Sequence, residues 1–295
     1  MRKACHLTFN ILTSDSQEFS PPTSLLFSKA KSLTGCSNCL ISAVINIDDR
    51  HSDLMVRDTQ AKVVTYSCKS VAEFNCSIVE QSFEGSRLLL DGNLVETSLP
   101  GEYNAYNILA MYCTAFVLGA AKEDIIANIP ELEAPVGRFE NLSGPNGLNV
   151  IIDYAHTPDA LEKVLDTLRV LAPERELVCL FGCTGDRDRT KRPEMAEISE
   201  RLADKIFVTA DDNRSEPIED IMEDIRKGFS DSGLAKVTFI HDRKEAILTS
   251  ILSASANAVI LLAGKGHERF LIDGNNRIPF SENEIVKESF DKIST

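Results

Sequence analysis

The 295-residue sequence lacks three features, each of which would suggest a class of protein at once. No segment has the pattern G-x-x-x-x-G-K-[S/T], the loop that holds the phosphates of a bound nucleotide. No apolar run approaches the roughly 20 residues that cross a bilayer, so we expect no transmembrane helix. The stretch after Arg2 and Lys3 is too short and too polar for a signal peptide, which predicts a cytoplasmic protein.

Basic residues and paired cysteines are also scarce. Lys and Arg total 31 against 45 Asp and Glu, and this net charge of −14 disfavours nucleic acid or an anionic membrane as the main partner. Cys36 and Cys39 form the one C-x-x-C pair, and no second pair at zinc spacing follows. Cys113 and Cys179 lie inside apolar runs, where a thiol behaves as a small hydrophobic group. We therefore expect reduced thiols and no zinc site.

The apolar pattern changes along the chain and predicts two domains. The first forty residues are irregular, and strand patterns then follow, with a hairpin at Asp91-Gly92 and a helix after Pro100-Gly101. A stretch rich in Pro and Gly, residues 131–147, indicates a boundary near its start. We predict one domain over residues 1–133 and a second over 134–295.

From residue 148 onward, apolar runs of strand length alternate with amphipathic helical patterns. Thr157, Asp242 and Ser281 are predicted N-caps, and Pro193 is predicted to open the helix between them. This alternation predicts an α/β fold for the second domain: a Rossmann-like, mostly parallel sheet with helices on both faces.

Four short polar loops each follow an apolar strand pattern in this second domain. They are DYAHTP (153–158), GCTGDRDRTKRP (182–193), TADDNRSE (209–216) and AGKGHE (263–268). In an open α/β sheet such loops meet at the carboxyl edge, where ligands bind. One loop of this kind is more often a set of surface ion pairs than a site. Four at equivalent positions predict one binding site.

The loops carry charges of both signs, as a ligand with ammonium and carboxylate groups would require. Gly182 and Gly185 allow the backbone to approach a ligand closely. Basic side chains of the second loop are predicted to pair with carboxylate or phosphate, and its acidic ones to fix them or to receive an amino group: Arg187, Lys191, Arg192, Asp186 and Asp188. The last loop adds Lys265, His267 and Glu268.

Together, these segments resemble the Mur ligases, and most closely those of the diaminopimelate-adding type. The resemblance rests on DYAHTPDALEKVL, FGCTGDRDRTKRPEMAEIS, TADDNRSEP and LLAGKGHE in this order, with GEYNAYNILAM, VGRFENL and AVINIDD before them. It extends over roughly residues 8–290. It implies an ATP-dependent ligase that adds diaminopimelate to UDP-N-acetylmuramoyl-L-alanyl-D-glutamate through an acyl phosphate. Residues 1–133 would then belong to the central ATP-binding domain and 134–295 to the amino-acid-binding domain.

The resemblance also implies roles for particular residues, with ATP and Mg²⁺ as cofactors. Near the nucleotide it places Asn104, Asn107, Arg138, Asp153 and His156. Around the amino acid it places Arg187, Asp211, Asp212, Arg214, Gly264 and Glu268, with arginines on a carboxylate and with Glu268 and the Gly264 carbonyl on an ammonium group. Lys31 matches a lysine that is carbamylated to hold Mg²⁺.

The sequence departs from the family pattern in two places. Asp211-Asp212-Asn213-Arg214 stands where the family has D-N-P-R, which leaves diaminopimelate and lysine as alternative amino acids. The UDP-binding domain and the G-T-N-G-K-T loop are missing, so we expect an N-terminally truncated ligase with little turnover by itself. The alternative is a non-catalytic remnant or an amino-acid-binding module that is completed by a separate N-terminal fragment. A folate-type glutamate ligase is disfavoured by the loop motifs.

Overall fold

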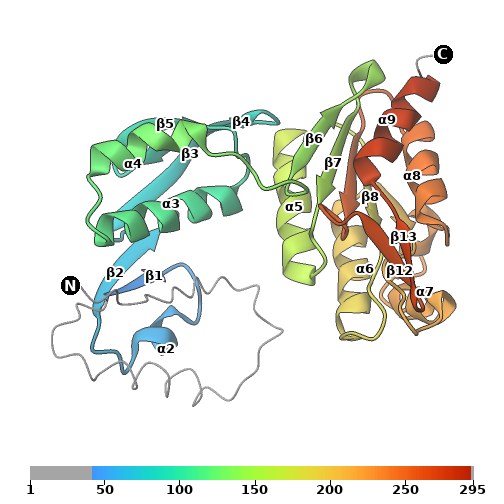
Figure 1. Cartoon of the computed structure of the whole chain (residues 1–295), viewed down its shortest axis with the longest axis horizontal. Helices are drawn as coiled ribbons and strands as arrows, with labels where there is room; N and C mark the ends of the chain where they lie inside the picture. Colours follow the sequence, from blue (N-terminus) through green and yellow to red (C-terminus); the bar gives the residue numbers. More distant parts are fainter. Residues whose placement is uncertain (1–41, 294–295) are drawn as a thin grey trace. The chain divides into compact units, whose positions relative to one another are not determined.

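The computed structural model describes residues 42–293, which form two compact units (Figure 1). The described part of the first unit comprises residues 42–80, 87–97 and 102–131. The second comprises residues 81–86, 98–101 and 132–293. The predicted irregular region of the first forty residues and Lys31 lie outside the described residues.

The first unit is built on a five-stranded sheet with the order β1-β2-β3-β4-β5. β1 and β2 pair in parallel, as do β2 and β3, and β4 and β5 flank the Asp91-Gly92 turn. The strands are β1 (Ser42–Asn46), β2 (Lys62–Ser67), β3 (Phe74–Ser82), β4 (Gly85–Leu90) and β5 (Asn93–Thr97). The apolar pattern predicted all five to within two residues.

Three α-helices accompany this sheet within the described residues. They are α2 (Ser52–Val56), α3 (Glu102–Val117) and α4 (Lys122–Asn128). α3 packs on β1 and β2, and its Tyr112 and Phe116 rings meet Phe74 edge to face. α3 was predicted, whereas the short helix α4 has too few turns to show an apolar stripe.

The second unit contains a six-stranded sheet with the order β10-β9-β8-β11-β7-β6. The first five strands in this order, from β10 to β7, are parallel to one another. β6, at the edge next to β7, is antiparallel. The strands are β6 (Glu140–Ser143), β7 (Asn149–Asp153), β8 (Leu177–Phe181), β9 (Lys205–Val208), β10 (Val237–Phe239) and β11 (Val259–Ala263). The predicted Rossmann-like, mostly parallel sheet is confirmed.

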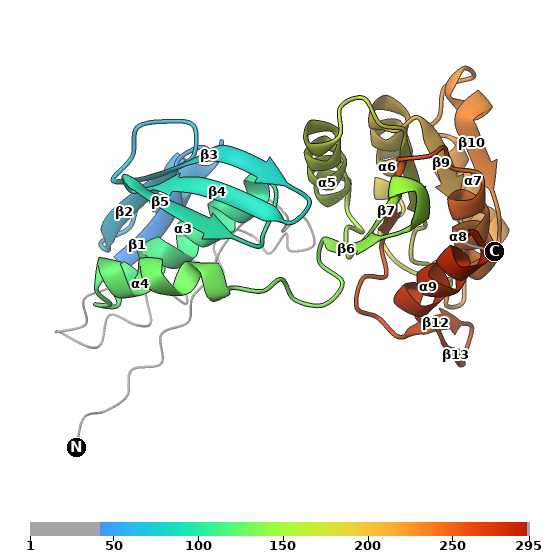
Figure 2. The ribbon, with the colours of Figure 1, turned by 90° about the horizontal axis from the view of Figure 1, so that it is seen from above.

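Helices cover both faces of this sheet, which explains why its inner strands β7, β8 and β11 are buried along their whole length (Figures 1 and 2). α5, α6 and α7 pack beside one another on one face, and α8 and α9 pack together on the other. Alternate strand residues such as Val150, Leu180 and Leu262 join the core under α8 and α9. The helices are α5 (Pro158–Leu171), α6 (Lys191–Leu202), α7 (Ile218–Arg226), α8 (Arg243–Leu252) and α9 (Glu282–Ile293).

The predicted helix starts are largely as observed. Thr157 Oγ1 accepts from Ala160 N, and Asp242 Oδ1 accepts from Glu245 N at 2.7 Å. The expectation that Pro193 opens α6 was wrong, because the helix begins two residues earlier at Lys191. The stretch assigned to the domain boundary also holds an unpredicted strand, β6, whose sequence ENLS has only one strongly apolar residue.

Beyond β11, a two-stranded hairpin precedes the last helix. Its strands β12 (Phe270–Asp273) and β13 (Asn276–Pro279) confirm the hairpin predicted around Asp273-Gly274. Across residues 42–293, no helix has both the length and the apolar character needed to cross a bilayer.

Candidate functional site at the carboxyl edge of the second sheet

The four polar loops follow strands that are neighbours in the sheet. β9, β8, β11 and β7 lie side by side and parallel, so the loops that follow them leave the sheet at the same edge. The sequence-based prediction that these loops lie together is therefore confirmed. Whether they bind a ligand depends on the side chains that they bring together.

Lys265 lies at the centre of the acidic side chains of this edge. Its ammonium group is buried and lies 2.7 Å from Asp212 Oδ1, 2.6 Å from Glu268 Oε2 and 3.6 Å from Asp211 Oδ1. We call Lys265, Asp211, Asp212 and Glu268 the Lys265 cluster. It contains three carboxylates and one cation, so it retains an excess of negative charge that suits a second ammonium group.

The carboxylates of the Lys265 cluster resemble a possible Mg²⁺ site, but Lys265 occupies it. Asp211, Asp212 and Glu268 offer oxygens within 4.8 Å of one another, as metal ligands do. Burial would lower the pKa of Lys265, but the three carboxylates outweigh it and hold that pKa above its ordinary value. The charged ammonium group therefore fills the position that a metal ion would take, and Mg²⁺ does not fit there.

The segment before β6 and the loop after β11 approach so closely that they require glycine. A Cβ on Gly137 would lie 2.1 Å from His267 N, and a Cβ on Gly266 would lie 2.6 Å from Gly137 O. Both glycines have positive φ angles, 72° and 51°. Gly264 has a φ of 115°, and a Cβ there would lie 3.3 Å from Asp211 Oδ2. Gly264 thus lies against the Lys265 cluster, as the predicted amino-acid site requires.

Asp153 ends β7 and is held by backbone groups. Its carboxylate accepts from Phe139 N at 2.7 Å and from Ala155 N at 2.8 Å, and its carbonyl accepts from Gly264 N at 3.0 Å. Burial raises its pKa above the ordinary value, although the two backbone N–H groups oppose this. Asp153 therefore orients the segments that carry Arg138 and His156.

The Tyr154 ring forms a platform on which the two basic candidates for nucleotide contact lie. The Arg138 guanidinium is 4.8 Å from the ring centre, and the rings of His156 and His267 are 4.7 and 5.1 Å away. The Tyr154 hydroxyl donates to Glu268 Oε1 at 3.2 Å, which connects this platform to the Lys265 cluster. Burial and then Glu268 raise the pKa of Tyr154. Arg138 is exposed and can meet an anionic ligand.

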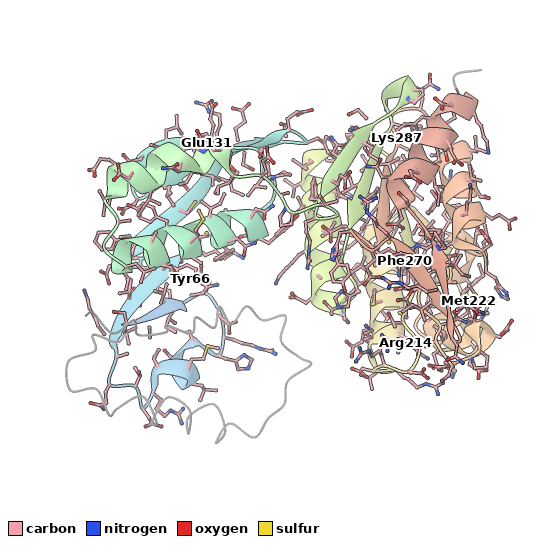
Figure 3. The ribbon with its side chains drawn as sticks, viewed as in Figure 1. Tyr66, Glu131, Arg214, Met222, Phe270 and Lys287 are labelled. Carbon is pink, nitrogen blue, oxygen red and sulfur yellow. The ribbon has the colours of Figure 1, made fainter. Side chains whose placement is uncertain are left out.

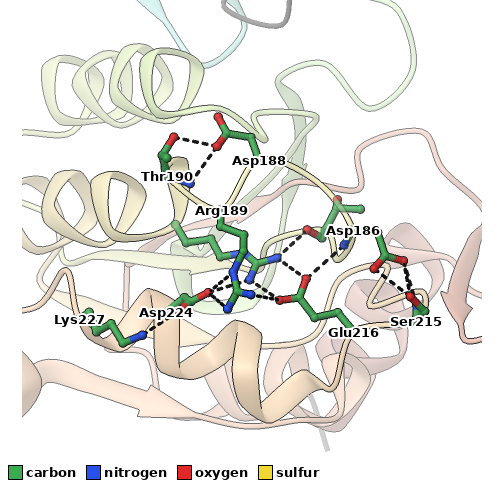
Figure 4. Close-up of polar contacts among 10 residues, drawn as sticks. Asp186, Asp188, Arg189, Thr190, Ser215, Glu216, Asp224 and Lys227 are labelled. Carbon is green, nitrogen blue, oxygen red and sulfur yellow. Dashed lines mark hydrogen bonds and ion pairs between the residues drawn. The ribbon is translucent and has the colours of Figure 1, made fainter.

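The basic residues at the end of the second loop have internal partners, which corrects the expectation that they meet a ligand (Figure 4). Arg192 is fully buried and donates to both oxygens of Glu216 at 2.7 Å and to Asp224 Oδ2 at 2.9 Å. The exposed Arg189 adds bonds to Asp224 at 2.8 and 2.6 Å. We call Arg189, Arg192, Glu216 and Asp224 the Arg192 cluster. Lys191 donates to the His156 carbonyl instead, at 2.9 Å.

The acidic residues of the second loop also act internally. Asp186 has a φ of 56° and accepts from Ser215 N at 3.1 Å and from Ser215 Oγ, and its own N–H donates to Glu216 Oε2 (Figure 4). Asp188 accepts from Thr190 N and Oγ1 at 2.9 and 2.7 Å. The predicted pairing of these carboxylates with the cations of their own loop was therefore wrong. They order the backbone of the second and third loops instead.

Arg187 and Arg214 are the cations that remain for a ligand carboxylate. Arg187 is exposed, and no hydrogen bond or ion pair of its side chain is found among residues 42–293. Arg214 is half-buried, has a φ of 52° and pairs by its backbone with the β12–β13 hairpin (Figure 3). Its Nε is buried without a partner in the described part of the chain. The second and third loops, which carry these arginines, are joined by the Asp186–Ser215 bonds.

Two predicted nucleotide residues lie in the first unit. Asn104 and Asn107 are one turn apart on α3, and Asn107 Nδ2 lies 3.4 Å from Asn104 Oδ1. Lys31, the predicted metal residue, lies outside the described residues. The sequence-based reasoning missed the central position of Lys265 and the roles of Tyr154, Glu216 and Arg243. Lys265 and Tyr154 stand inside the quoted motifs, so their positions were visible in the sequence but their partners were not.

Comparison with known proteins agrees with this architecture. The family model described as Mur ligase middle domain matches residues 18–115, and the one described as Mur ligase, glutamate ligase domain, matches residues 137–266. The chain belongs to the Mur ligase family.

Its similarity to particular members is substantial. It is 38% identical over 251 residues to UDP-N-acetylmuramoyl-L-alanyl-D-glutamate–2,6-diaminopimelate ligase of Cytophaga hutchinsonii, which covers 85% of this chain and 52% of the relative. The enzyme of the same name from Pseudomonas syringae pv. tomato is 44% identical over 247 residues, 82% of this chain and 50% of the relative. A solved structure of a ligase with this name matches with a TM-score of 0.59 at 32% identity, over 92% of this chain and 57% of that one. The chain thus spans about half the length of these curated relatives.

Proposed function

We propose that this chain carries the amino-acid-binding part of an ATP-dependent ligase that adds diaminopimelate to UDP-N-acetylmuramoyl-L-alanyl-D-glutamate. The observation that carries the proposal is the charge arrangement at the carboxyl edge of the second sheet. The Lys265 cluster contains three carboxylates and only one ammonium group. Arg187 and Arg214 add two cations at the same edge of the sheet. An amino acid needs this combination, because its ammonium and carboxylate groups are only a few bonds apart.

Diaminopimelate fits this edge better than lysine does. It has a carboxylate beside each of its two ammonium groups, whereas lysine has a single carboxylate. Arg187 lacks a partner among residues 42–293, and the Arg214 Nε is likewise unpaired in that range. Two cations would therefore be available for the carboxylates, while Glu268, Asp211 and the Gly264 carbonyl receive ammonium. Asp212 already accepts two bonds at its Oδ1, from Lys265 Nζ at 2.7 Å and from Ile272 N at 2.9 Å.

The proposal assigns the nucleotide to other residues. Arg138, Asp153 and His156 would face ribose and phosphates, and Asn104 and Asn107 of the first unit would lie near adenine. Residues 1–133 would then be part of the ATP-binding domain and 134–295 the amino-acid-binding domain, in a cytoplasmic enzyme. ATP would supply the activated phosphate when bound, with Mg²⁺ held outside the Lys265 cluster and Lys31 as its candidate residue.

Isothermal titration of the purified chain with meso-diaminopimelate and L-lysine tests the amino-acid site directly. We expect binding of diaminopimelate, weaker binding of lysine, and a loss of about tenfold to hundredfold in affinity for Arg187→Ala, as for other charged hydrogen bonds. Arg201→Ala is the matched control, because Arg201 is exposed and its one ion pair among residues 42–293 is with Glu162 of α5. Absence of binding by the unaltered chain, or an equal loss in both variants, would refute the proposal.

The alternative, a non-catalytic amino-acid-binding module, predicts the same titration result but a different result in an assay of the ligation reaction. In that case the chain binds diaminopimelate, yet forms no amide product from ATP and the UDP-muramoyl dipeptide, alone or with a separate N-terminal fragment. Product formation in either mixture supports the ligase.

A further inference from the structure

A buried arginine below the candidate site contacts two of its loops at once. Arg243 is the first residue of α8 and is 1% exposed. Its guanidinium donates to the Ala263 carbonyl at 2.8 Å and to the Ala210 carbonyl at 3.2 Å. Ala210 directly precedes Asp211, and Ala263 directly precedes Gly264. A single side chain therefore holds the backbone positions from which both halves of the Lys265 cluster begin.

The sheet itself does not fix the distance between these two positions. β9 and β11 are not neighbours, because β8 lies between them in the strand order. No ladder hydrogen bond can therefore connect Ala210 with Ala263. The planar guanidinium offers several N–H donors in a fixed fork, so it bridges two carbonyls at a defined separation.

Glu282 holds the guanidinium in place from a different helix. It opens α9, is 2% exposed, and its Oε1 accepts from Arg243 Nε at 2.9 Å and lies 2.8 Å from a second guanidinium nitrogen. Its Oε2 is buried with no partner among the described residues. A buried ion pair of this kind adds little net stability over an apolar pair of similar size, because desolvation offsets the attraction. Its contacts are better explained by what they position.

We propose that Arg243, held by Glu282, is a positioning residue that sets the separation between the Asp211 and Gly264 sides of the site and thereby the affinity for the amino acid. The inference rests on the proposed function for its ligand, but the coupling of the two loops can be measured without one. Arg243 touches no ligand itself and acts through the carbonyls of Ala210 and Ala263.

The test compares Arg243→Lys with Arg175→Lys. Lysine keeps the charge at position 243 but cannot reach both carbonyls and Glu282 together. Arg175 makes bonds of the same kind at the opposite edge of the sheet, to the carbonyls of Gly147 and Ala258 at 2.8 and 3.2 Å. Both variants lose guanidinium bonds to carbonyls, and only one of them loses the bonds below the site.

Two measurements are made on each variant after circular dichroism has confirmed its fold. Titration with meso-diaminopimelate is expected to show a dissociation constant raised about tenfold or more for Arg243→Lys and unchanged for Arg175→Lys. Hydrogen exchange of the ligand-free chain is expected to rise together in segments 209–216 and 263–268 for Arg243→Lys, with segment 158–171 as the unaffected reference. Glu282→Gln, which keeps the size of the side chain, should give a smaller change of the same pattern.

The outcomes separate this inference from the proposed function. If the unaltered chain binds no amino acid, the proposed function fails, and the exchange data alone decide the role of Arg243. Unchanged exchange in the two loops of a folded Arg243→Lys variant overturns the inference. So does a tenfold loss of diaminopimelate affinity in Arg175→Lys, because general destabilisation would then explain the effect.

Discussion

Replacing Arg192 with methionine tests how strongly the Arg192 cluster holds the second and third loops. Methionine has a similar length but no charge, so Glu216 and Asp224 lose bonds of 2.7 and 2.9 Å while they stay largely buried, with side chains 12% and 13% exposed. Removing one partner of a buried ion pair typically costs about 3–5 kcal/mol of folding free energy. Arg189 stays 2.6 Å from Asp224 and compensates part of the charge, so we expect a loss of about 2–3 kcal/mol.

The matched control is Arg189→Met, which removes a cation from the same two carboxylates. Arg189 is 60% exposed, so its ion pairs should contribute at most about 1 kcal/mol. Urea unfolding is followed by far-ultraviolet circular dichroism, since the chain contains no tryptophan. Hydrogen exchange of segments 182–190 and 209–216 assigns the change to the two loops. A loss for Arg189→Met equal to that for Arg192→Met would refute the importance of burial here.

Two further predictions concern pH and backbone packing. The bond from Arg192 lowers the pKa of Glu216 to about 2, and hydrogen bonds outweigh burial to lower the pKa of Asp224 to about 2. Depressed carboxylate pKa values stabilise the fold above the unfolded values of 4.5 and 3.8, so this contribution should fade in acid titrations as pH falls from there toward 2. Gly137→Ala should lower the thermal midpoint more than Gly92→Ala, because both have positive φ but only the first Cβ meets another backbone; equal shifts would contradict this.

The sequence predicted the alternation of strands and helices well, for a physical reason. Strands covered on both faces are mainly apolar, and the helices between them show a single apolar stripe, as α5 does with Leu161, Val164 and Leu168. Because parallel strands end at the same edge, the shared position of the four loops followed as well. β6 was missed because a short, half-buried edge strand carries polar residues such as Glu140 and Asn141.

The burial and the ion-pair partners of each charged side chain could not be predicted in the same way. Arg187 and Arg192 stand five residues apart in one motif, yet one is exposed and the other is fully buried. The difference comes from Glu216 and Asp224, which lie 24 and 32 residues further along the chain. Lys265 likewise meets Asp212 across 53 residues. A single sequence records which charges are present, but only the packing of distant segments shows which of them pair.

The position of β11 has a consequence for how the protein is made. This strand lies between β7 and β8, although it begins only at Val259, whereas they end at Asp153 and Phe181. During synthesis β7, β8, β9 and β10 therefore leave the ribosome before β11, the strand that pairs with both β7 and β8, has been made. Until β11 inserts, β7 and β8, which are buried along their whole length in the folded protein, present unpaired edges that invite association between nascent chains. Such long-range pairing also slows folding, so the assembly of the four loops is a late and cooperative event that depends on residues 259–263.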